Sequence, residues 1–212
     1  MNRINTLVLL FYFFVPLCGA SQKTEKKFAV TTDPALFSNH IAFQPGFQYT
    51  FNNWAVLGEV AYMSAKKMDF DGGHWLRTQL EFKRFLTRDV IKFYGSFQTA
   101  FSARKFIDAD SGFYFTSHLV DTGATYSSAV IHSPVLSFAP KIGMEASLGK
   151  IVFLDFFVGC GVRILFNHYD AQGVAPTMVF HKREWGPDAA WRFNQTVATF
   201  HLPMGLRLGI RF

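Results

Sequence analysis

Acidic and basic side chains recur at alternate positions within otherwise apolar segments of this chain. They are Glu59, Arg77, Glu81, Lys83, Lys92, Lys141, Glu145, Asp155, Arg163, Arg207 and Arg211. Such charges could form a buried salt-bridge network, line a path for ions, or supply acid and base groups for catalysis. We expect the network, because isolated charges in a narrow interior are costly and opposite charges satisfy one another.

Histidine and serine residues suggest two other kinds of chemistry. The histidines in or beside the segments between the alternating stretches are His40, His74, His118, His132, His168 and His181. No two of them have the short spacing of a preformed metal site, so we expect no metal and no other cofactor. A nucleophile, base and acid for lipid modification could come from Ser127, Ser128, His132, Ser133, Asp121 and Glu184.

Tryptophan and charged side chains occur together between residues 167 and 196. These residues are Arg183, Trp185, Trp191 and Arg192. Exposed aromatic and arginine side chains often dominate binding affinity, so the segment is a candidate binding site for an extracellular ligand. The alternative is that the tryptophans form a small core of their own within this segment.

The elements that would position these residues have a period of two. In the last segment, Phe200, Leu202, Met204, Leu206, Leu208, Ile210 and Phe212 alternate with His201, Pro203, Gly205, Arg207, Gly209 and Arg211. A helix would spread the apolar residues around its axis, whereas a strand separates them onto one face. Six further segments alternate in the same way, covering 41–51, 54–62, 76–83, 91–101, 136–148 and 152–166.

Seven alternating segments predict an all-β fold, a closed antiparallel transmembrane β-barrel. Bacterial single-chain barrels have even numbers of strands, so we expect about eight, with Lys27 to Thr32 as the first. The last strand then places Leu206 toward lipid and Arg207 toward the lumen. On this basis Leu206→Arg should impair assembly more than Arg207→Leu, because a lipid-facing charge is costly.

The connections sort by length into two sets. Asn52-Asn53, Thr87 to Asp89 and Gly149-Lys150 are tight turns, whereas Met68 to Gly73, Lys105 to Ser133 and Asn167 to Thr196 are mostly longer. Such barrels carry short periplasmic turns and long extracellular loops, so we expect both termini in the periplasm.

Prolines and aromatic residues give two further local predictions. Pro45, Pro140 and Pro203 predict bulges near the outer rim, because proline removes a donor from the strand ladder. Aromatic residues predict girdles at the two membrane interfaces. We place Phe51, Trp54, Phe85 and Phe212 at one rim, and Trp75, Phe101, Phe166 and Phe200 at the other.

Composition fits this architecture and limits the function classes. Of 212 residues half are hydrophobic and 26 are Phe, yet after residue 20 no apolar run is long enough for a membrane-spanning helix. Residues 1–20 have the parts of a cleavable signal peptide, with cleavage expected before Ser21 and one barrel domain in 21–212. The net charge is +6, but its cations are scattered among acids, so we expect no nucleic-acid partner.

Three stretches resemble the small, mostly uncharacterised outer-membrane β-barrel proteins of Gram-negative bacteria. They begin at Phe138, Leu148 and Leu202, and the last reads Leu-Pro-Met-Gly-Leu-Arg-Leu-Gly-Ile-Arg-Phe. The resemblance implies an eight-stranded barrel in the bacterial outer membrane, in contact with its lipid. It also implies that the assembly machinery recognises a C-terminal signal formed by Leu206, Leu208, Ile210 and Phe212.

The function favoured by these observations is a structural or loop-mediated binding role, with charged side chains plugging the lumen. A lipid-modifying enzyme, an acyl hydrolase or transferase, is the alternative. A small-solute channel is the third possibility. An extracellular ligand of unknown identity is the expected binding partner.

Overall fold

A computed structural model of the chain describes residues 27–34, 43–64, 72–87, 90–116, 122–178 and 189–212, almost all of them in β-strands. The first five strands are β1 (Lys27–Pro34), β2 (Phe43–Phe51), β3 (Trp54–Ser64), β4 (Gly72–Phe85) and β5 (Ile91–Asp108). The next five are β6 (Gly112–Phe115), β7 (Thr122–Tyr126), β8 (Ser128–His132), β9 (Val135–Leu148) and β10 (Val152–Gly159). The remaining elements are β11 (Gly161–Phe166), β12 (His168–Gln172), β13 (Ala175–Met178), the 3-10 helix η2 (Ala189–Arg192), β14 (Thr196–His201) and β15 (Met204–Arg211).

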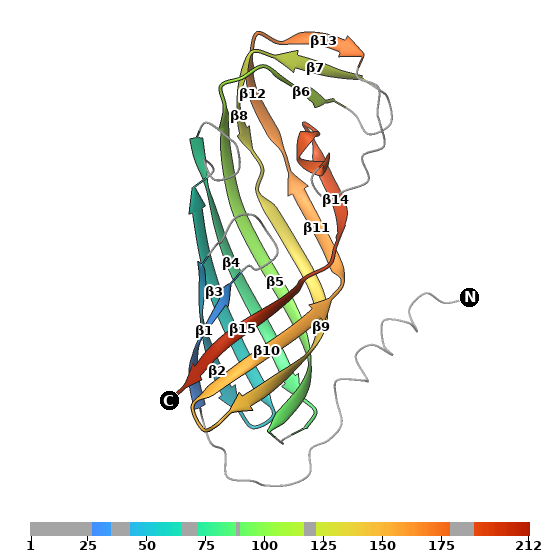
Figure 1. Cartoon of the computed structure of the whole chain (residues 1–212). Coiled ribbons are helices and arrows are strands. Elements are labelled where there is room, and N and C mark those ends of the chain that lie inside the picture. The colour runs from blue at the N-terminus through green and yellow to red at the C-terminus, as the bar shows by residue number, and fades with distance from the viewer. Residues whose placement is uncertain (1–26, 35–42, 65–71, 88–89, 117–121, 179–188) are drawn as a thin grey trace, which may run out of the picture.

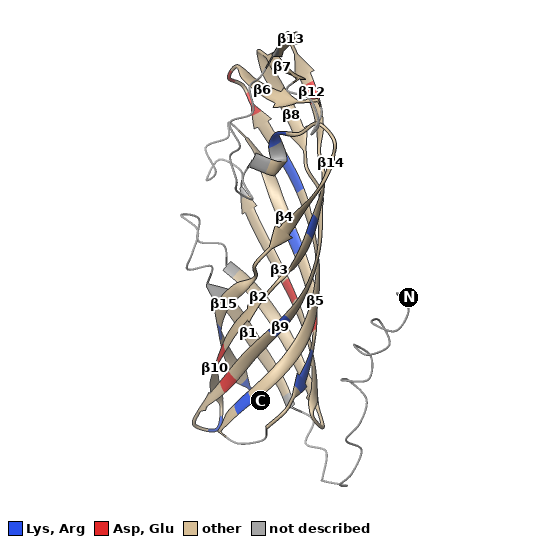
Figure 2. Ribbon diagram, turned by 90° about the vertical axis from the view of Figure 1, so that its right-hand side faces the viewer, with Lys and Arg blue, Asp and Glu red and all other residues tan. Residues whose placement is uncertain are grey.

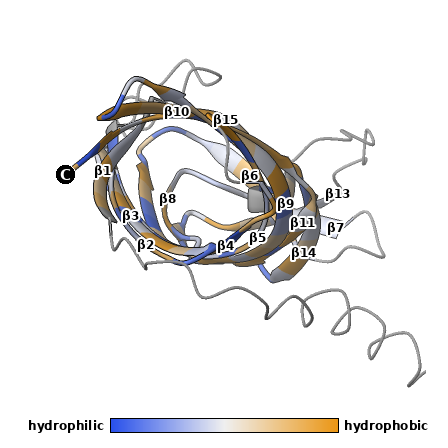
Figure 3. Cartoon of the chain, turned by 90° about the horizontal axis from the view of Figure 1, so that it is seen from below, coloured by the Kyte–Doolittle hydropathy of each residue, from blue (hydrophilic) through white to orange (hydrophobic). Residues whose placement is uncertain are grey.

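Eight antiparallel strands close into a barrel. Around the wall they run β1, β2, β3, β4, β5, β9, β10 and β15, and the circle closes where β15 pairs with β1. Figure 3 looks along the barrel from below and shows these strands surrounding the interior. The predicted fold class is therefore confirmed, and β1 supplies the eighth strand at the expected place.

Several of the named strands are continuations of one another. Ser102 of β5 pairs with Val135 of β9, and Lys105, three residues later, pairs with His132 of β8, three residues earlier. The strands β8 and β9 therefore follow one unbroken register opposite β5. The strands β10, β11 and β12 continue in the same way along β9 and β8. These long strands raise one side of the wall far above the other (Figure 1).

The two longest predicted connections therefore contain much regular structure. The segments Lys105 to Ser133 and Asn167 to Thr196 include the end of β5 and the strands β6, β7, β8, β12 and β13. Their alternation continues beyond the predicted strand ends, because Phe106, Ile131 and Tyr169 are buried on the inner side. Treating these segments as connections alone was wrong.

The predicted proline bulges are absent from the described strands. Pro140 pairs with Phe97 in register with its neighbours Ala139 and Lys141, and no residue is inserted. The register is also continuous across Pro203. From the pair Val158↔Met204 to the pair Gly161↔His201, both strands advance by three residues. Each proline removes one N–H donor, but the Cys160 N–H still donates to the Pro140 carbonyl oxygen at 3.2 Å. The ladder therefore loses a bond without changing register.

The predicted inside and outside faces are present in the barrel wall. Large apolar side chains such as Val60, Phe82, Phe97, Ile142 and Ile210 are exposed on the outer face. Two predicted girdle residues lie elsewhere. Phe85 is buried and packs against Tyr94, and Trp75 follows the inner-face alternation of Arg77 and Gln79 on β4. Aromatic character alone does not show which face of a strand a ring occupies.

A small three-stranded sheet, which we call the platform, crosses the raised side of the wall. It consists of β6, β7 and β13 (Figure 1). Beneath it, Tyr114, Tyr126 and Tyr169 form an aromatic cluster with Phe106 and Ile131. A second cluster joins Phe115 of β6 and Phe193 after η2 to Val135 and Leu165 of the wall, so the platform packs onto the wall through a shared core.

Candidate functional site

The inner face of the barrel is built around Arg207 of β15, whose side chain is fully buried. Its Nε donates to Glu59 Oε1 at 2.9 Å and its Nη2 donates to Glu59 Oε2 at 3.1 Å. The guanidinium also lies 2.9 Å from a Glu81 oxygen and 3.2 Å from Asp155 Oδ2. One cation thus bridges carboxylates from β3, β4 and β10, three separate parts of the wall.

Two lysines balance the remaining carboxylate charge. Lys83 Nζ donates to Asp155 Oδ2 at 2.5 Å, and Lys141 Nζ donates to Glu81. We call Glu59, Glu81, Lys83, Lys141, Asp155 and Arg207 the central network. It has three acidic and three basic residues. The side chains of all six are fully buried and form ion pairs. Figure 2 shows acidic and basic residues together on this stretch of the wall.

Neutral donors complete the central network. The Tyr94 hydroxyl donates to Asp155 Oδ1 at 2.6 Å, and the Ser96 hydroxyl donates to Glu81 at 2.7 Å. Gln44 and Gln79 both donate to Glu59, at 3.1 and 2.6 Å. Buried carboxylates need such bonds in addition to their ion pairs, because burial removes their hydration.

Below the central network a second ion pair lies close to the turn end of the barrel. Arg211 pairs with Glu145 and donates to the Ser147 hydroxyl at 3.0 Å. The Phe153 ring packs under the Arg211 guanidinium, 4.4 Å from its centroid. Gly209 makes room for that ring, since a Cβ there would lie 2.1 Å from Phe153 Cζ. Small and large residues thus fill the interior around the charges.

The predicted interior charges divide into two groups in the structure. Eight of them form ion pairs among the described residues: Glu59, Glu81, Lys83, Lys141, Glu145, Asp155, Arg207 and Arg211. The other three are Arg77, which donates to Gln79 at 2.8 Å, Lys92, which lies over the Phe85 ring, and Arg163 of β11. Sequence reasoning did not include Tyr94 or the glutamines, because neutral side chains alternate with apolar ones throughout the chain.

Among the described residues, the candidate catalytic side chains do not come together. His132 and Ser133 are neighbours on one wall strand and so point to opposite faces. The Ser133 hydroxyl lies inside, where it donates to Asn167 Oδ1 at 2.6 Å, while His132 lies 3.7 Å from Asp170 on the outer face. Asp121 and Glu184 lie outside the described residues. Among the described residues, no three His, Cys, Asp or Glu side chains are placed to hold a metal ion.

Two of the four candidate binding residues, Trp191 and Arg192, are among the described residues. Arg183 and Trp185 lie outside the described residues, and Trp191 lies in η2. The Arg192 guanidinium stacks over the Phe113 ring of β6 at 5.2 Å. The assembly-signal residues Leu208, Ile210 and Phe212 are exposed on the outer face, and Leu206 is half-buried there.

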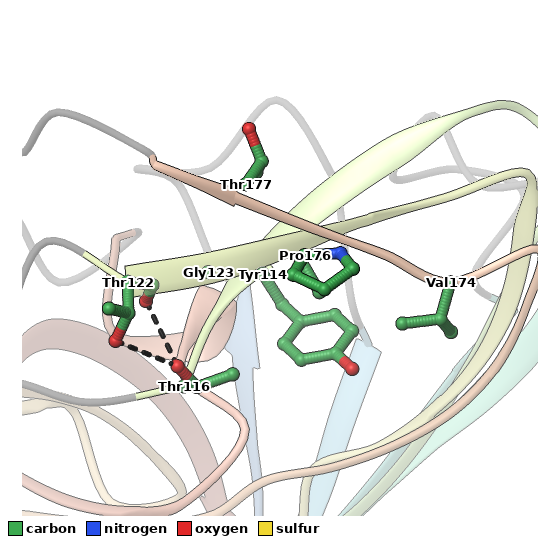
Figure 4. A pocket seen from close by; sticks show the side chains of 8 residues that line it. Tyr114, Thr116, Thr122, Gly123, Val174, Pro176 and Thr177 are labelled. Carbon is green, nitrogen blue, oxygen red and sulfur yellow. Dashed lines mark hydrogen bonds between the residues drawn. The ribbon is translucent and has the colours of Figure 1, made fainter.

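An open groove of about 570 Å³ lies across the platform. Figure 4 shows Tyr114 and Pro176 beside each other in it, with Thr116 hydrogen-bonded to Thr122 at one edge. Below the groove the Tyr126 hydroxyl donates to Asp108 at 2.8 Å. Burial, and then this hydrogen bond, raise the pKa of Tyr126 well above its usual range. The tyrosines therefore present neutral, amphipathic surfaces.

Comparison with known proteins identifies no family for the chain. No family model matches the chain, and no curated protein matches it. Among solved structures, the chain is similar to the crystal structure of a major outer membrane protein from Thermus thermophilus. That similarity has a TM-score of 0.49 and 11% sequence identity, and it covers 88% of this chain and 99% of the other. Within the described residues no helix has the length and hydrophobicity needed to cross a membrane.

Proposed function

We propose that this protein is an outer-membrane barrel with a closed lumen that acts by binding a ligand through its extracellular platform. The observation that carries the proposal is the central network. A lumen crossed by Arg207 and three carboxylates, with no unbalanced charge within the network, has no clear path for solutes. What remains available for interaction is then the raised end of the molecule.

The outer face of the wall supports a membrane location. Large apolar side chains are exposed on every barrel strand, from Val30 on β1 to Ile210 on β15. Soluble proteins rarely expose contiguous apolar surface of this extent, whereas a transmembrane barrel requires an apolar band of this kind. We place the tight turns and the C-terminus in the periplasm and the platform outside the cell. In this arrangement Leu206, Leu208, Ile210 and Phe212 also serve as the signal for the assembly machinery.

The platform supports a binding role because strands and aromatic packing hold its groove above the membrane. Tyr114 of the groove stacks on Tyr169, with ring centroids 4.8 Å apart, so it is fixed before any ligand arrives. Preorganised aromatic surface binds at a low entropic cost. Trp185 and Arg183 are proposed as further contacts for the extracellular ligand.

Conductance of the purified full barrel in planar lipid bilayers tests the closed lumen. We expect almost no current from the wild-type protein, because eight strands leave a narrow interior that side chains fill. Glu145→Ala and Asp155→Ala should produce openings, since each leaves a cation unbalanced and removes volume. Asp170→Ala, on the outer face, is the matched control and should stay silent. Stable, ion-selective openings of the wild type would refute the proposal.

A further inference from the structure

The upper part of the lumen contains a row of polar side chains that lies outside the central network. Trp75 of β4 pairs with Arg104 of β5, and the Ser133 N–H donates to the Arg104 carbonyl oxygen at 2.9 Å. Ser133 then contacts Asn167, whose N–H is bonded to Gln195 at 3.4 Å. We call Trp75, Arg104, Ser133, Asn167 and Gln195 the upper row. Its members come from five neighbouring segments of the wall.

Arg104 is the only charged residue of the upper row, and its partners are neutral. Its Nε donates to the Ser133 carbonyl oxygen at 2.9 Å and its Nη2 donates to the Ser133 hydroxyl at 2.8 Å. The guanidinium also lies 5.9 Å from the centroid of the Phe106 ring. None of these contacts neutralises its charge. A largely enclosed cation without an anion is costly, so this arrangement needs an explanation.

Nearby groups increase the positive potential. The positive charge of Arg163, four residues lower along the inner face, acts on Arg104. Below them, the charges of Arg163, Arg77 and Lys141 act on His201. Positive charges from several strands therefore act on the inner face of this part of the wall.

Hydrogen-bond donors in the same region lack acceptors. Trp75 Nε1 and Gln195 Nε2 are buried donors with no hydrogen-bond partner among the described residues. Buried donors are nearly always satisfied in folded proteins, by protein, water or ligand. Trp75 and Gln195 need an acceptor, and Arg104 of the same row needs a negative charge, so an anion with several oxygens would meet both requirements.

The upper row lies where the outer face of the wall changes from apolar to polar. One step lower, Leu76 and Phe166 are exposed apolar residues. One step higher, His74 pairs with Lys105, Lys105 with His132, and His132 with His168, giving a polar outer row. A membrane interface at this change would put the upper row at the depth of lipid phosphates.

We propose that the upper row binds an oxyanion of the phosphate class. The Arg104 guanidinium supplies the charge, and the Trp75 and Gln195 donors of the same row supply further hydrogen bonds. Arginine suits this role because its planar fork matches phosphate oxygens and stays charged. The anion is either a free phosphate that enters the lumen or the phosphate of a lipid headgroup at the same depth. This site is separate from the platform and does not depend on the platform binding a ligand.

Titration of the purified full chain in a neutral detergent tests the site. The probes are inorganic phosphate, dihexanoyl phosphatidic acid and dihexanoyl phosphatidylcholine, followed by tryptophan fluorescence and thermal unfolding. We expect saturable binding of a phosphate monoester and weaker or no binding of the zwitterionic lipid. Binding of both inorganic phosphate and phosphatidic acid identifies a free-anion site, and binding of phosphatidic acid alone identifies a headgroup site.

Variants distinguish the site from general electrostatic attraction. Arg104→Gln should weaken binding at least about tenfold, in line with the loss of a charged hydrogen bond, and Arg104→Lys should recover part of it. Trp75→Phe should weaken binding about threefold or more, because it removes one donor and keeps the ring. Lys105→Gln removes the same charge from the next residue, which faces outward, and should leave binding within about twofold.

The folded state of each variant is checked by heat-modifiable migration in gels. If Arg104→Gln does not fold, Trp75→Phe and Gln195→Leu decide the question. The proposal is overturned if neither inorganic phosphate nor phosphatidic acid binds saturably. So does binding that Lys105→Gln weakens as much as Arg104→Gln.

Discussion

The central network and the upper row use similar residues but differ in how their charges are balanced. In the central network Arg207 contacts three carboxylates, and each lysine has its own acidic partner. In the upper row Arg104 contacts neutral oxygens, and Arg163 adds to its charge. A charged barrel interior is thus a structural plug where signs alternate between neighbouring strands. Where a cation such as Arg104 has neutral partners, the interior is better suited to binding an anion.

The largest effect should come from breaking the central network at its centre. Arg207→Leu leaves Glu59 without its two guanidinium bonds and Glu81 and Asp155 with one cation each. Removing one partner of a buried pair costs about 3 to 5 kcal/mol, so the free energy of unfolding in a urea titration should fall by that amount. Arg211→Leu is the control. Arg211 contacts one carboxylate and its side chain is 13% exposed, so its loss should cost clearly less.

A smaller loss is expected from a charge on the lipid-facing side of the same strand. Leu206→Arg places a cation in the apolar band and should cost about 2 to 4 kcal/mol, measured as the fraction of heat-modifiable, protease-resistant barrel. Leu206→Met keeps the apolar surface and should behave as wild type. From the sequence alone Leu206→Arg is the more damaging change. The contacts of Arg207 reverse that order, and equal assembly of Leu206→Arg and wild type would contradict the assignment of the faces.

The strands and their faces could be predicted because period-two alternation is local, and β1 to β5, β9, β10 and β15 follow it closely. Contacts across the lumen could not be predicted in the same way. Arg207 and Glu59 are 148 positions apart, and their pairing depends on closure and on the register of every strand between them. The wall continuations β8 and β12 were missed because Ser133-Pro134 and Asn167 resemble strand ends. The upper row was not predicted as a site, since Trp75 and Ser133 were assigned other roles and Arg104 lay in a segment expected to be near a strand end.

The platform provides a third region, in which a tyrosine interacts with a carboxylate. Tyr126→Phe removes the hydrogen bond to Asp108 and should lower the free energy of unfolding by about 1 to 2 kcal/mol. The raised pKa of Tyr126 also predicts a pH dependence. In the unfolded chain its hydroxyl ionises near pH 10, whereas in the folded chain it stays protonated. Its contribution is therefore complete below about pH 10 and is lost as the pH rises toward the higher folded pKa.

Ultraviolet titration of tyrosine ionisation measures this difference directly. The wild type should retain a protonated tyrosine above pH 10 that Tyr126→Phe lacks, and its stability should fall with pH more steeply than that of the variant. Tyr62→Phe, at a side chain that is 65% exposed, is the matched control and should leave both measurements unchanged. Equal titration of Tyr126 and exposed tyrosines would show that the cluster beneath the platform is open to solvent.

The smallest effect on stability should come from Arg104→Gln, because this residue is only partly buried, whereas the residues of the central network are fully buried. Its two bonds to Ser133 contribute about 1 kcal/mol each, but removing its charge also relieves the repulsion from Arg163. In buffer without phosphate the net loss should therefore stay below about 1 kcal/mol, far less than for Arg207→Leu.

Added phosphate monoester then separates the two regions. A ligand that binds only the folded state stabilises it by about 2.7 kcal/mol at one hundred times its Kd. Wild type and the outward-facing control Lys105→Gln should gain this stability, while Arg104→Gln should gain little at the same concentration. If Arg104→Gln destabilised the barrel as much as Arg207→Leu and phosphate stabilised neither protein, Arg104 would be structural and the two regions would not differ in kind.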